Sequence, residues 1–353
     1  MKKFFLPFFL FFSFSLFSLE VRVKLQEPLY IEVKGNAVLK GEKLSQEILS
    51  PWGWIKVREG KIFFRWKSWG KELEIIPKNR MFKLGKRWYP GKLKILVKDG
   101  EAIPVNILDI ENYLEGVVGA EMPYYFPLEA LKSQAVVSRT YALYSLNPQA
   151  PYDLTQEVSD QCYLGLSRRT NKVIEAVRET KGEILTKNGK VIPAHFCACC
   201  GGYTEWAKEV WKDSPPYLCG VPDPYCQKAP VFQWSYRISW RKLGQILGGK
   251  VKGLEVLERS PSGRVKKLKV FYRNDEKIIS GMELRRILGY SHLKSTLFRI
   301  VEGRFFVRFI GQGWGHGVGM CQWGAKGMAE KGYNYREILK FYFPFAEISK
   351  YEN

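Results

Sequence analysis

The hydrophobic pattern of this chain changes its period at residue 109, and this change sets the class of fold that the chain can adopt. Before that point, short runs such as VRVKL, YIEVKG and ELEIIP alternate apolar with polar residues, which is typical of half-buried strands. A hairpin that turns at residues 98–100 is predicted for LKILVKDGEAIPVNI. Beyond residue 109, apolar residues recur at helical spacing. We therefore predict a mixed α+β fold, with a β-rich N-terminal region over residues 19–100 and an α/β region over residues 101–353.

Two helices are predicted just after this change. The first lies in DIENYLEGVVGAEMP and ends before Pro123, and the second begins at Pro127, where the missing N–H costs nothing, and runs to about residue 146. The second helix carries an apolar stripe, and Arg139 falls in the middle of it. Because an isolated buried charge is very costly, Arg139 needs a partner if it is buried. The candidate carboxylates for such a pair are Asp109, Glu115 and Asp160.

The remaining elements follow the same signals. Helices are predicted over residues 171–180, in GMELRRILG and in YREILKFYF, and a hairpin is predicted to turn at Asn188-Gly189. Strands alternate with one helix between residues 230 and 310. The segment GQGWGHGVGMCQWGAKG is glycine-rich and then helical.

Residues 1–18 are typical of a secretory signal peptide. Lys2 and Lys3 precede an apolar run over residues 4–17, which is short for a membrane span of about 20 residues. We predict export to the periplasm, the cell wall or the extracellular space, with this segment either cleaved after Ser18 or retained as an N-terminal anchor. No further transmembrane helix is predicted. The net charge of +21 indicates a polyanionic partner, and in an exported protein it favours anionic wall polymers over nucleic acid.

Three remote segments carry specific motifs. Residues 112–143 contain AEMP followed by EALKSQAVVSRTYAL; residues 161–165 and 193–205 read QCYLG and PAHFCACCGGYTE; residues 311–344 contain GWGHGVGMCQWGA. Together these motifs resemble the SpoIID/LytB family, which is named for a sporulation protein and an amidase enhancer. The resemblance spans roughly residues 85–344.

The resemblance implies a role at the cell wall. The best-understood members of the family are lytic transglycosylases that act on peptidoglycan glycan strands stripped of their stem peptides, and they need no cofactor for the reaction. Their catalytic glutamate is that of the AEMP motif, which is Glu121 here. Other members enhance an N-acetylmuramoyl-L-alanine amidase without clear chemistry of their own. The expected partners are therefore glycan strands and, in the alternative, a wall amidase.

The chemistry of lytic cleavage needs only one carboxyl group. An acid protonates the leaving glycosidic oxygen, and the same group then deprotonates the 6-hydroxyl of the sugar as it attacks the anomeric carbon. Glu121 lies between the apolar run VVGA and Met122-Pro123, and an apolar setting raises the pKa of a carboxyl group as this role requires. The alternative is that Glu121 forms a buried ion pair with Arg139. The chain has no nucleotide-binding loop and no HExxH motif, which argues against NTP-using enzymes and zinc proteases.

Eight further residues are predicted to line the sugar groove or to orient the catalytic group. Histidine in a glycine-rich loop is typically accessible, and paired glycines bring backbone close to a ligand. The alternatives are a buried ion pair for Arg139, and ordinary turn or loop hydrogen bonds for the threonine and the histidine. The predicted set is Gln134, Arg139, Tyr141, Tyr163, Gly202, Thr204, His316 and Gln322.

A cluster of soft ligands precedes and includes the CACC sequence. Three cysteines and a histidine within six residues favour a structural zinc site, to which two later cysteines would contribute. An exported compartment favours one or two disulfides instead. The residues concerned are His195, Cys197, Cys199, Cys200, Cys219 and Cys226. Some members of the family carry zinc ligands as Cys-x4-His-Cys before a Q-x-Y-x-G motif, where this chain has Leu154, Ser159 and Asp160, so any metal here must use other residues.

Overall fold

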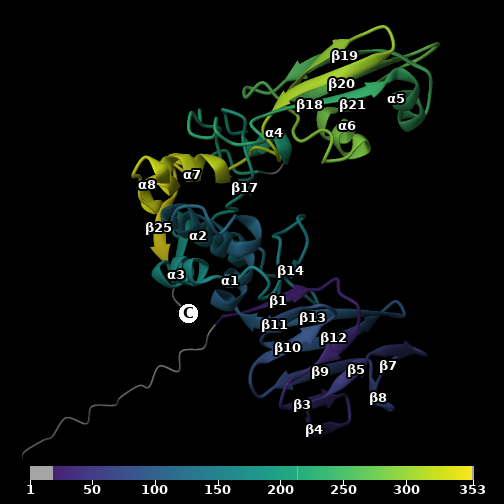
Figure 1. The fold of residues 1–353 in the computed structure, drawn as a ribbon, viewed down its shortest axis with the longest axis vertical. Coiled ribbons are helices and arrows are strands. Elements are labelled where there is room, and N and C mark those ends of the chain that lie inside the picture. Colours follow the sequence, from purple (N-terminus) through teal and green to yellow (C-terminus); the bar gives the residue numbers. More distant parts are fainter. Residues whose placement is uncertain (1–18, 213, 352–353) are drawn as a thin grey trace, which may run out of the picture.

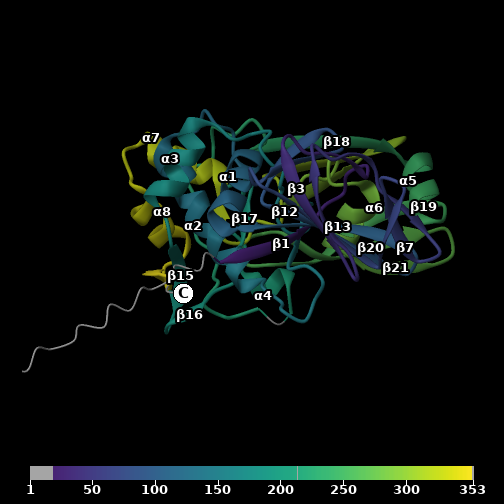
Figure 2. The same cartoon turned by 90° about the horizontal axis from the view of Figure 1, so that it is seen from below.

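The computed structural model describes residues 19–212 and 214–351, so the predicted signal peptide lies outside the described residues. The fold is α+β, as predicted. The N-terminal sheets and a later β-rich unit lie at opposite ends of a helical core, and both extend to the same side of it (Figures 1 and 2). Among the described residues, no helix combines the length and the apolar composition needed to cross a membrane.

A seven-stranded sheet dominates the N-terminal region, with the order β14-β1-β13-β12-β9-β3-β4. Alternating residues such as Val21, Val23, Leu93 and Ile95 are fully buried on its inner face, as the period of two requires. Its strands are β1 (Glu20–Lys24), β3 (Asn36–Gly41), β4 (Ser45–Leu49), β9 (Glu72–Pro77), β12 (Lys92–Lys98), β13 (Glu101–Asp109) and β14 (Leu154–Thr155). A four-stranded sheet contains β2 (Tyr30–Glu32), β5 (Trp52–Trp54), β10 (Met81–Leu84) and β11 (Arg87–Pro90), and a three-stranded sheet contains β6 (Lys56–Arg58), β7 (Lys61–Phe64) and β8 (Lys67–Gly70).

The predicted hairpin joins β12 to β13. Asp99 and Gly100 have φ values of 52° and 81°, the left-handed pair that a tight hairpin turn needs. Strand β13 then continues to Asp109, and its residues 105–109 pair with β1. The predicted boundary at residue 100 therefore falls inside a hairpin, and the β-rich region extends to Asp109, where the chain enters its first helix.

The helical core follows the predicted pattern. Asp109 caps the first helix by accepting hydrogen bonds from the backbone N–H groups of Glu111 and Asn112. The helices are α1 (Ile110–Glu121), α2 (Leu128–Tyr144), α3 (Asn171–Glu179), α7 (Gln322–Glu330) and α8 (Tyr335–Tyr342), with a small sheet of β15 (Glu183–Lys187), β16 (Lys190–Val191) and β25 (Glu347–Lys350). Helix α2 contacts the other four helices and is the centre of this core.

A separate unit is inserted between the second and third motif segments. It contains β18 (Gln233–Ser239), α5 (Trp240–Leu247), β19 (Val251–Arg259), β20 (Val265–Tyr272), β21 (Glu276–Ser280), α6 (Gly281–Leu288), β22 (Phe298–Glu302) and β23 (Phe306–Gln312). Its buried residues, among them Leu243, Leu268 and Phe309, form a hydrophobic core distinct from that of the rest of the chain. The α/β region over residues 101–353 is thus built on two cores.

The inserted unit also contains a helix that we did not predict. Ser239 caps α5 by accepting a hydrogen bond from the N–H of Lys242, and Gly248 ends it in the left-handed conformation with φ 79°. Both signals are present in the sequence, but the helix has only eight residues and its apolar pattern is short.

Candidate active site around Glu121

Glu121 is the last residue of α1, and the residues that follow it determine this position. Pro123 disfavours helical conformation at the preceding residue, and Met122 is extended, with φ −119° and ψ 138°. The helix therefore stops at Glu121 while Met122 is buried in the core. The carboxylate projects from the end of a helix whose other side chains are largely buried.

Two glycines let the second motif segment lie directly on α1. A Cβ at Gly116 would lie 2.5 Å from the ring of Tyr163, and a Cβ at Gly119 would collide with the carbonyl oxygen of Arg168. This close approach brings the backbone N–H of Cys162 to 2.5 Å from Glu121 Oε1, to which it donates a hydrogen bond. One carboxylate oxygen is thereby held in place by backbone.

The third motif segment reaches the same carboxyl group through Gln322. This residue begins α7, and its side-chain amide lies beside Glu121, where it lowers the pKa of the carboxyl group. Its Nε2 also lies 3.3 Å from Gln134 Oε1, and Gln134 in turn donates to the Ser138 hydroxyl at 2.9 Å. The three remote segments therefore meet at Glu121.

The environment of Glu121 favours the protonated form. Burial raises the pKa of this carboxyl group from its ordinary 4.5 to about 7, while the hydrogen bonds from Cys162 and Gln322 limit the rise. Among the described residues, no cationic side chain lies within salt-bridge distance of it. Both protonation states are populated near neutral pH, which is what a group that must first donate and then accept a proton requires.

Arg139 is paired, but with a carboxylate that we did not name. Its Nη2 and Nε contact the Glu111 carboxylate at 2.6 Å and 2.9 Å, and its Nη1 donates to the Glu183 carbonyl oxygen at 3.0 Å. Arg139 is 1% exposed. The predicted pair with Glu121 is therefore wrong, as are the three candidate partners and the prediction that Arg139 binds substrate. The reason is that Arg139 packs against the first turn of α1, whereas Glu121 ends that helix.

Three other predicted groove residues are buried. Tyr163 is fully buried and donates from its hydroxyl to Asn106 Oδ1 at 2.8 Å, Gln134 is fully buried beside Gln322, and Thr204 is 1% exposed and bonds to the backbone of Val221. None of these side chains has surface that a glycan could touch, so the prediction that they line the groove is wrong, whereas the prediction that Gln134 helps to orient the catalytic group stays a prediction. Gln134 acts on the site only through Gln322.

Tyr141 and His316 belong to an aromatic cluster with two other residues. His195 stacks on Trp211 with 4.3 Å between ring centroids; His316 lies 5.1 Å from Trp211 and 6.2 Å from His195; and Tyr141 lies 5.9 Å from His195. Burial lowers the pKa of His195 to about 4 and that of His316 to about 3, so both imidazoles are neutral at pH 7. We had predicted that His195 lies with the cysteines. It lies among the aromatic rings of this cluster instead. Trp211 was missed, because nothing in its local sequence distinguishes it from a packing residue.

Gly202 has φ 107° and is partly exposed, as a turn that borders a ligand requires. Its predicted place at the edge of the groove is compatible with this geometry and stays a prediction.

The cysteines gather in part. Cys200 and Cys226 are buried with their sulfur atoms 3.6 Å apart, and Cys199 also contacts the sulfur of Cys226. Cys219 is only partly buried, and no sulfur contact joins it to this group, because the loop that carries it turns toward the backbone of residues 203–206. Two residues that we did not predict complete the group: Cys321 from the third motif segment and Asp223.

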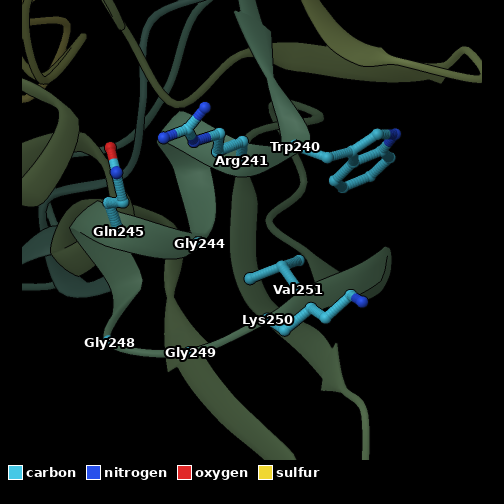
Figure 3. A pocket seen from close by; sticks show the side chains of 8 residues that line it. All are labelled: Trp240, Arg241, Gly244, Gln245, Gly248, Gly249, Lys250 and Val251. Atoms are coloured by element: carbon cyan, nitrogen blue, oxygen red, sulfur yellow. The ribbon is translucent and has the colours of Figure 1, made fainter.

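A pocket of the inserted unit is lined by other residues. It has a volume of about 600 Å³ and is lined by α5, the glycines that follow it and the start of β19 (Figure 3). Trp240 and Arg241 border it on one side and Lys250 on the other. None of its lining residues belongs to the three motif segments.

The chain is similar to known proteins over most of its length. The family described as stage II sporulation protein (SpoIID) matches residues 98–186, and a domain of unknown function, DUF8618, matches residues 222–319, which include the inserted unit. An uncharacterized protein of Brachyspira hyodysenteriae is 34% identical over 94% of this chain and 93% of its own length. The amidase enhancer of Bacillus subtilis is 32% identical over 84% of this chain and 50% of its own length, and stage II sporulation protein D of Bacillus subtilis is 30% identical over 70% and 76%.

Proposed function

Because the chain belongs to the family of stage II sporulation protein D, we propose that it acts on the cell wall, as an exported lytic transglycosylase that cleaves peptidoglycan glycan strands to 1,6-anhydromuramic acid ends. The names of its relatives connect the family with sporulation and with enhancement of an amidase. The observation that carries the enzymatic proposal is the convergence of three remote segments on one carboxyl group, Glu121, whose pKa is about 7.

In the proposed reaction, protonated Glu121 donates its proton to the glycosidic oxygen as the bond to the anomeric carbon of muramic acid breaks. Positive charge develops on that carbon and on the ring oxygen. The 6-hydroxyl oxygen of the same sugar attacks the anomeric carbon and closes a second, 1,6-anhydro ring, and the Glu121 carboxylate takes the hydroxyl proton. The carboxyl group is then protonated again and ready for the next strand, so no water is consumed.

The surroundings of Asp160 and Glu205, which are the candidates for a second catalytic carboxylate, favour internal attack over hydrolysis. Asp160 Oδ2 accepts hydrogen bonds from the N–H and hydroxyl of Thr155 at 2.9 Å and 2.7 Å, and its Oδ1 accepts from the Tyr141 hydroxyl at 3.2 Å. Glu205 is 2% exposed and accepts from the hydroxyls of two serines of the inserted unit. A hydrolase needs a second carboxylate that is free to activate water, and both of these are occupied.

The aromatic cluster of Tyr141, His195, Trp211 and His316 supports a sugar subsite beside the carboxyl group. The Tyr141 hydroxyl donates to Asp160 Oδ1 at 3.2 Å, and Glu121 accepts from the N–H of Cys162, two residues further along the chain, so the cluster lies next to the carboxyl group. Neutral imidazoles and an indole face present the apolar surface with polar edges on which a pyranose ring stacks. Trp211 is 37% exposed, so a strand has access to it.

The alternative function is that of a non-catalytic wall-binding protein that enhances an amidase. The similarity to the amidase enhancer of Bacillus subtilis favours it, and so do three exposed tryptophans of the N-terminal region, Trp52, Trp54 and Trp66. The net charge of +21 suits the anionic polymers of a wall in either case.

Mass spectrometry of glycan strands stripped of stem peptides, after incubation with the mature chain, tests the proposal. We expect fragments with 1,6-anhydro ends, and reducing ends would mean that water attacks. Intact strands that nevertheless bind the protein, together with faster cleavage by an added wall amidase, would support the enhancer function instead.

A further inference from the structure

Four buried side chains from three separate parts of the chain bring their ligand atoms together. The sulfur atoms of Cys200, Cys226 and Cys321 and a carboxylate oxygen of Asp223 all lie within 4.8 Å of one another. Each of the four residues has no exposed surface. We propose that these residues bind one structural zinc ion, and we call them the S3O site.

Two distances within the S3O site are close to those around a tetrahedral ion. With zinc–sulfur bonds of about 2.3 Å and zinc–oxygen bonds of about 2.0 Å, tetrahedral ligands lie about 3.8 Å apart for two sulfurs and about 3.5 Å for sulfur and oxygen. The Cys200 and Cys226 sulfurs are 3.6 Å apart, and the Cys200 sulfur is 3.1 Å from Asp223 Oδ2. Thiolate-rich tetrahedral sites select zinc over the harder divalent cations.

A second layer of hydrogen bonds holds these ligands in place. The Tyr342 hydroxyl donates to Asp223 Oδ2 at 3.0 Å, and the Tyr225 N–H donates to Asp223 Oδ1 at 2.9 Å. The sulfur of Cys321 accepts from the N–H groups of Cys200 at 3.2 Å and Gly324 at 3.3 Å. Such donors stabilise negative charge on sulfur and carboxylate and fix the orientation of ligands around a metal.

A disulfide explains this arrangement less well than a metal does. One bond between Cys200 and Cys226 would leave the buried Cys321 and the buried carboxylate of Asp223 without a counter-charge or a metal. Burial of an unpaired carboxylate is costly. An ion of charge +2 would offset about half of the negative charge of three thiolates and one carboxylate, and it would bind the Asp223 carboxylate together with the sulfurs.

The S3O site also explains how the third motif segment is held. Cys321 is followed directly by Gln322, whose side chain reaches Glu121. The ion would tie the start of α7 to Cys200 and to the loop of Asp223 and Cys226, so that Gln322 is anchored on one side. The inference itself does not depend on glycan cleavage.

Elemental analysis of the full mature chain, purified without chelator, tests the proposal first. We expect one zinc per chain, together with seven alkylated cysteines when the denatured protein is treated in the presence of a chelator. The proposal would be overturned in favour of a disulfide by a metal-free protein in which fewer than seven cysteines are alkylated. The intact mass of such a protein would be lower by two hydrogen atoms for each disulfide. Stoichiometric iron in place of zinc would overturn the identity of the ion.

Variants then test the ligand set. Cys226→Ser and Asp223→Asn should retain less than a tenth of the zinc of the parent chain, whereas the matched control Cys219→Ser, outside the site, should retain all of it. Cys199→Ser should also keep its zinc, because its sulfur is a neighbour of the site and not one of the four ligands. Loss of zinc in Cys199→Ser with retention in Asp223→Asn would overturn the assignment of the carboxylate. Where a cysteine variant fails to fold, release of zinc from the parent chain by a thiol-specific reagent, measured with a chromophoric chelator, tests whether thiolates hold the ion; zinc that stays bound after all seven thiols have reacted would overturn the proposal.

Discussion

Replacing Glu121 with glutamine tests both the chemistry of this carboxyl group and its environment. The variant keeps the size of the side chain and one acceptor oxygen but has no proton to transfer. We expect the yield of 1,6-anhydro ends to fall by at least about two orders of magnitude, the usual contribution of a general acid, with little change in strand binding.

The same substitution should change how stability depends on pH. Between the ordinary pKa of 4.5 and the folded value of about 7, the folded chain holds a proton that the unfolded chain has released. The free energy of unfolding therefore falls as pH rises through this window, by about 3 kcal/mol in total, since one pKa unit is worth about 1.4 kcal/mol. Glutamine does not titrate, so in the variant this contribution is absent.

The substitution also lowers the free energy of unfolding by an amount that does not depend on pH. Two donors approach the Glu121 carboxyl group, the Cys162 N–H at Oε1 and the Gln322 amide, and glutamine replaces one acceptor oxygen with an NH2 group that faces one of these donors. One unsatisfied donor costs about 1 kcal/mol or more at every pH. The variant should therefore be less stable than the parent at pH 5 and more stable at pH 8, and the diagnostic quantity is the slope of the difference.

Denaturant unfolding of both proteins between pH 4.5 and pH 8.5 measures that slope, and strand cleavage is measured on the same samples. Glu157→Gln is the matched control, because Glu157 is exposed, and it should change neither quantity. If the free energies of unfolding of parent and Glu121→Gln change with pH in parallel, burial does not hold this carboxyl group protonated. Full cleavage by the variant would end its catalytic assignment.

Three further outcomes follow from the site. Cleavage by the parent should decline above pH about 7 as Glu121 ionises, and Gln322→Leu, which removes a donor that lowers the pKa of Glu121, should move this decline to higher pH in a kcat/KM profile. Arg139→Met should destabilise the fold by about 3–5 kcal/mol in urea unfolding, because the Glu111 carboxylate loses its buried partner, while the folded fraction still cleaves. Tyr163→Phe should cost about 1 kcal/mol for one lost hydrogen bond with an unchanged KM, and a raised KM would restore Tyr163 as a substrate contact.

The parts of the fold that were predictable from sequence depend on residues close together in the chain. Pro123 ends α1 through its effect on its immediate neighbour, and Asn188 and Gly189 adopt φ values of 51° and 72° because a two-residue hairpin turn demands them. The position of Glu121 at a helix end follows from the same local rule. That three remote segments meet at Glu121 was predicted from the motifs. Rules about neighbouring residues could not have predicted it.

The parts that were not predictable depend on which surfaces meet. The apolar stripe of α2 required a partner for Arg139, but the choice of Glu111 depends on how α2 crosses α1. Cys321 joins a site whose other residues lie about a hundred positions earlier, and no spacing rule connects them. A residue type such as tyrosine suits a groove and a core equally well, so burial decides between the two, and burial is a property of the assembled fold.

The inserted unit also holds the loop that carries Cys200. It leaves the core after Cys226 and returns before Cys321, and its first and last strands are paired with Gln233 opposite Gln312, so the two ends enter and leave side by side. Its Arg264 is 2% exposed and donates to the carbonyl oxygens of Cys200 at 2.6 Å and Tyr203 at 3.0 Å. A buried arginine held by carbonyl oxygens fixes the backbone that carries them. The unit therefore clamps the loop of the second motif segment from outside, at the same residue that the proposed zinc ion holds from within.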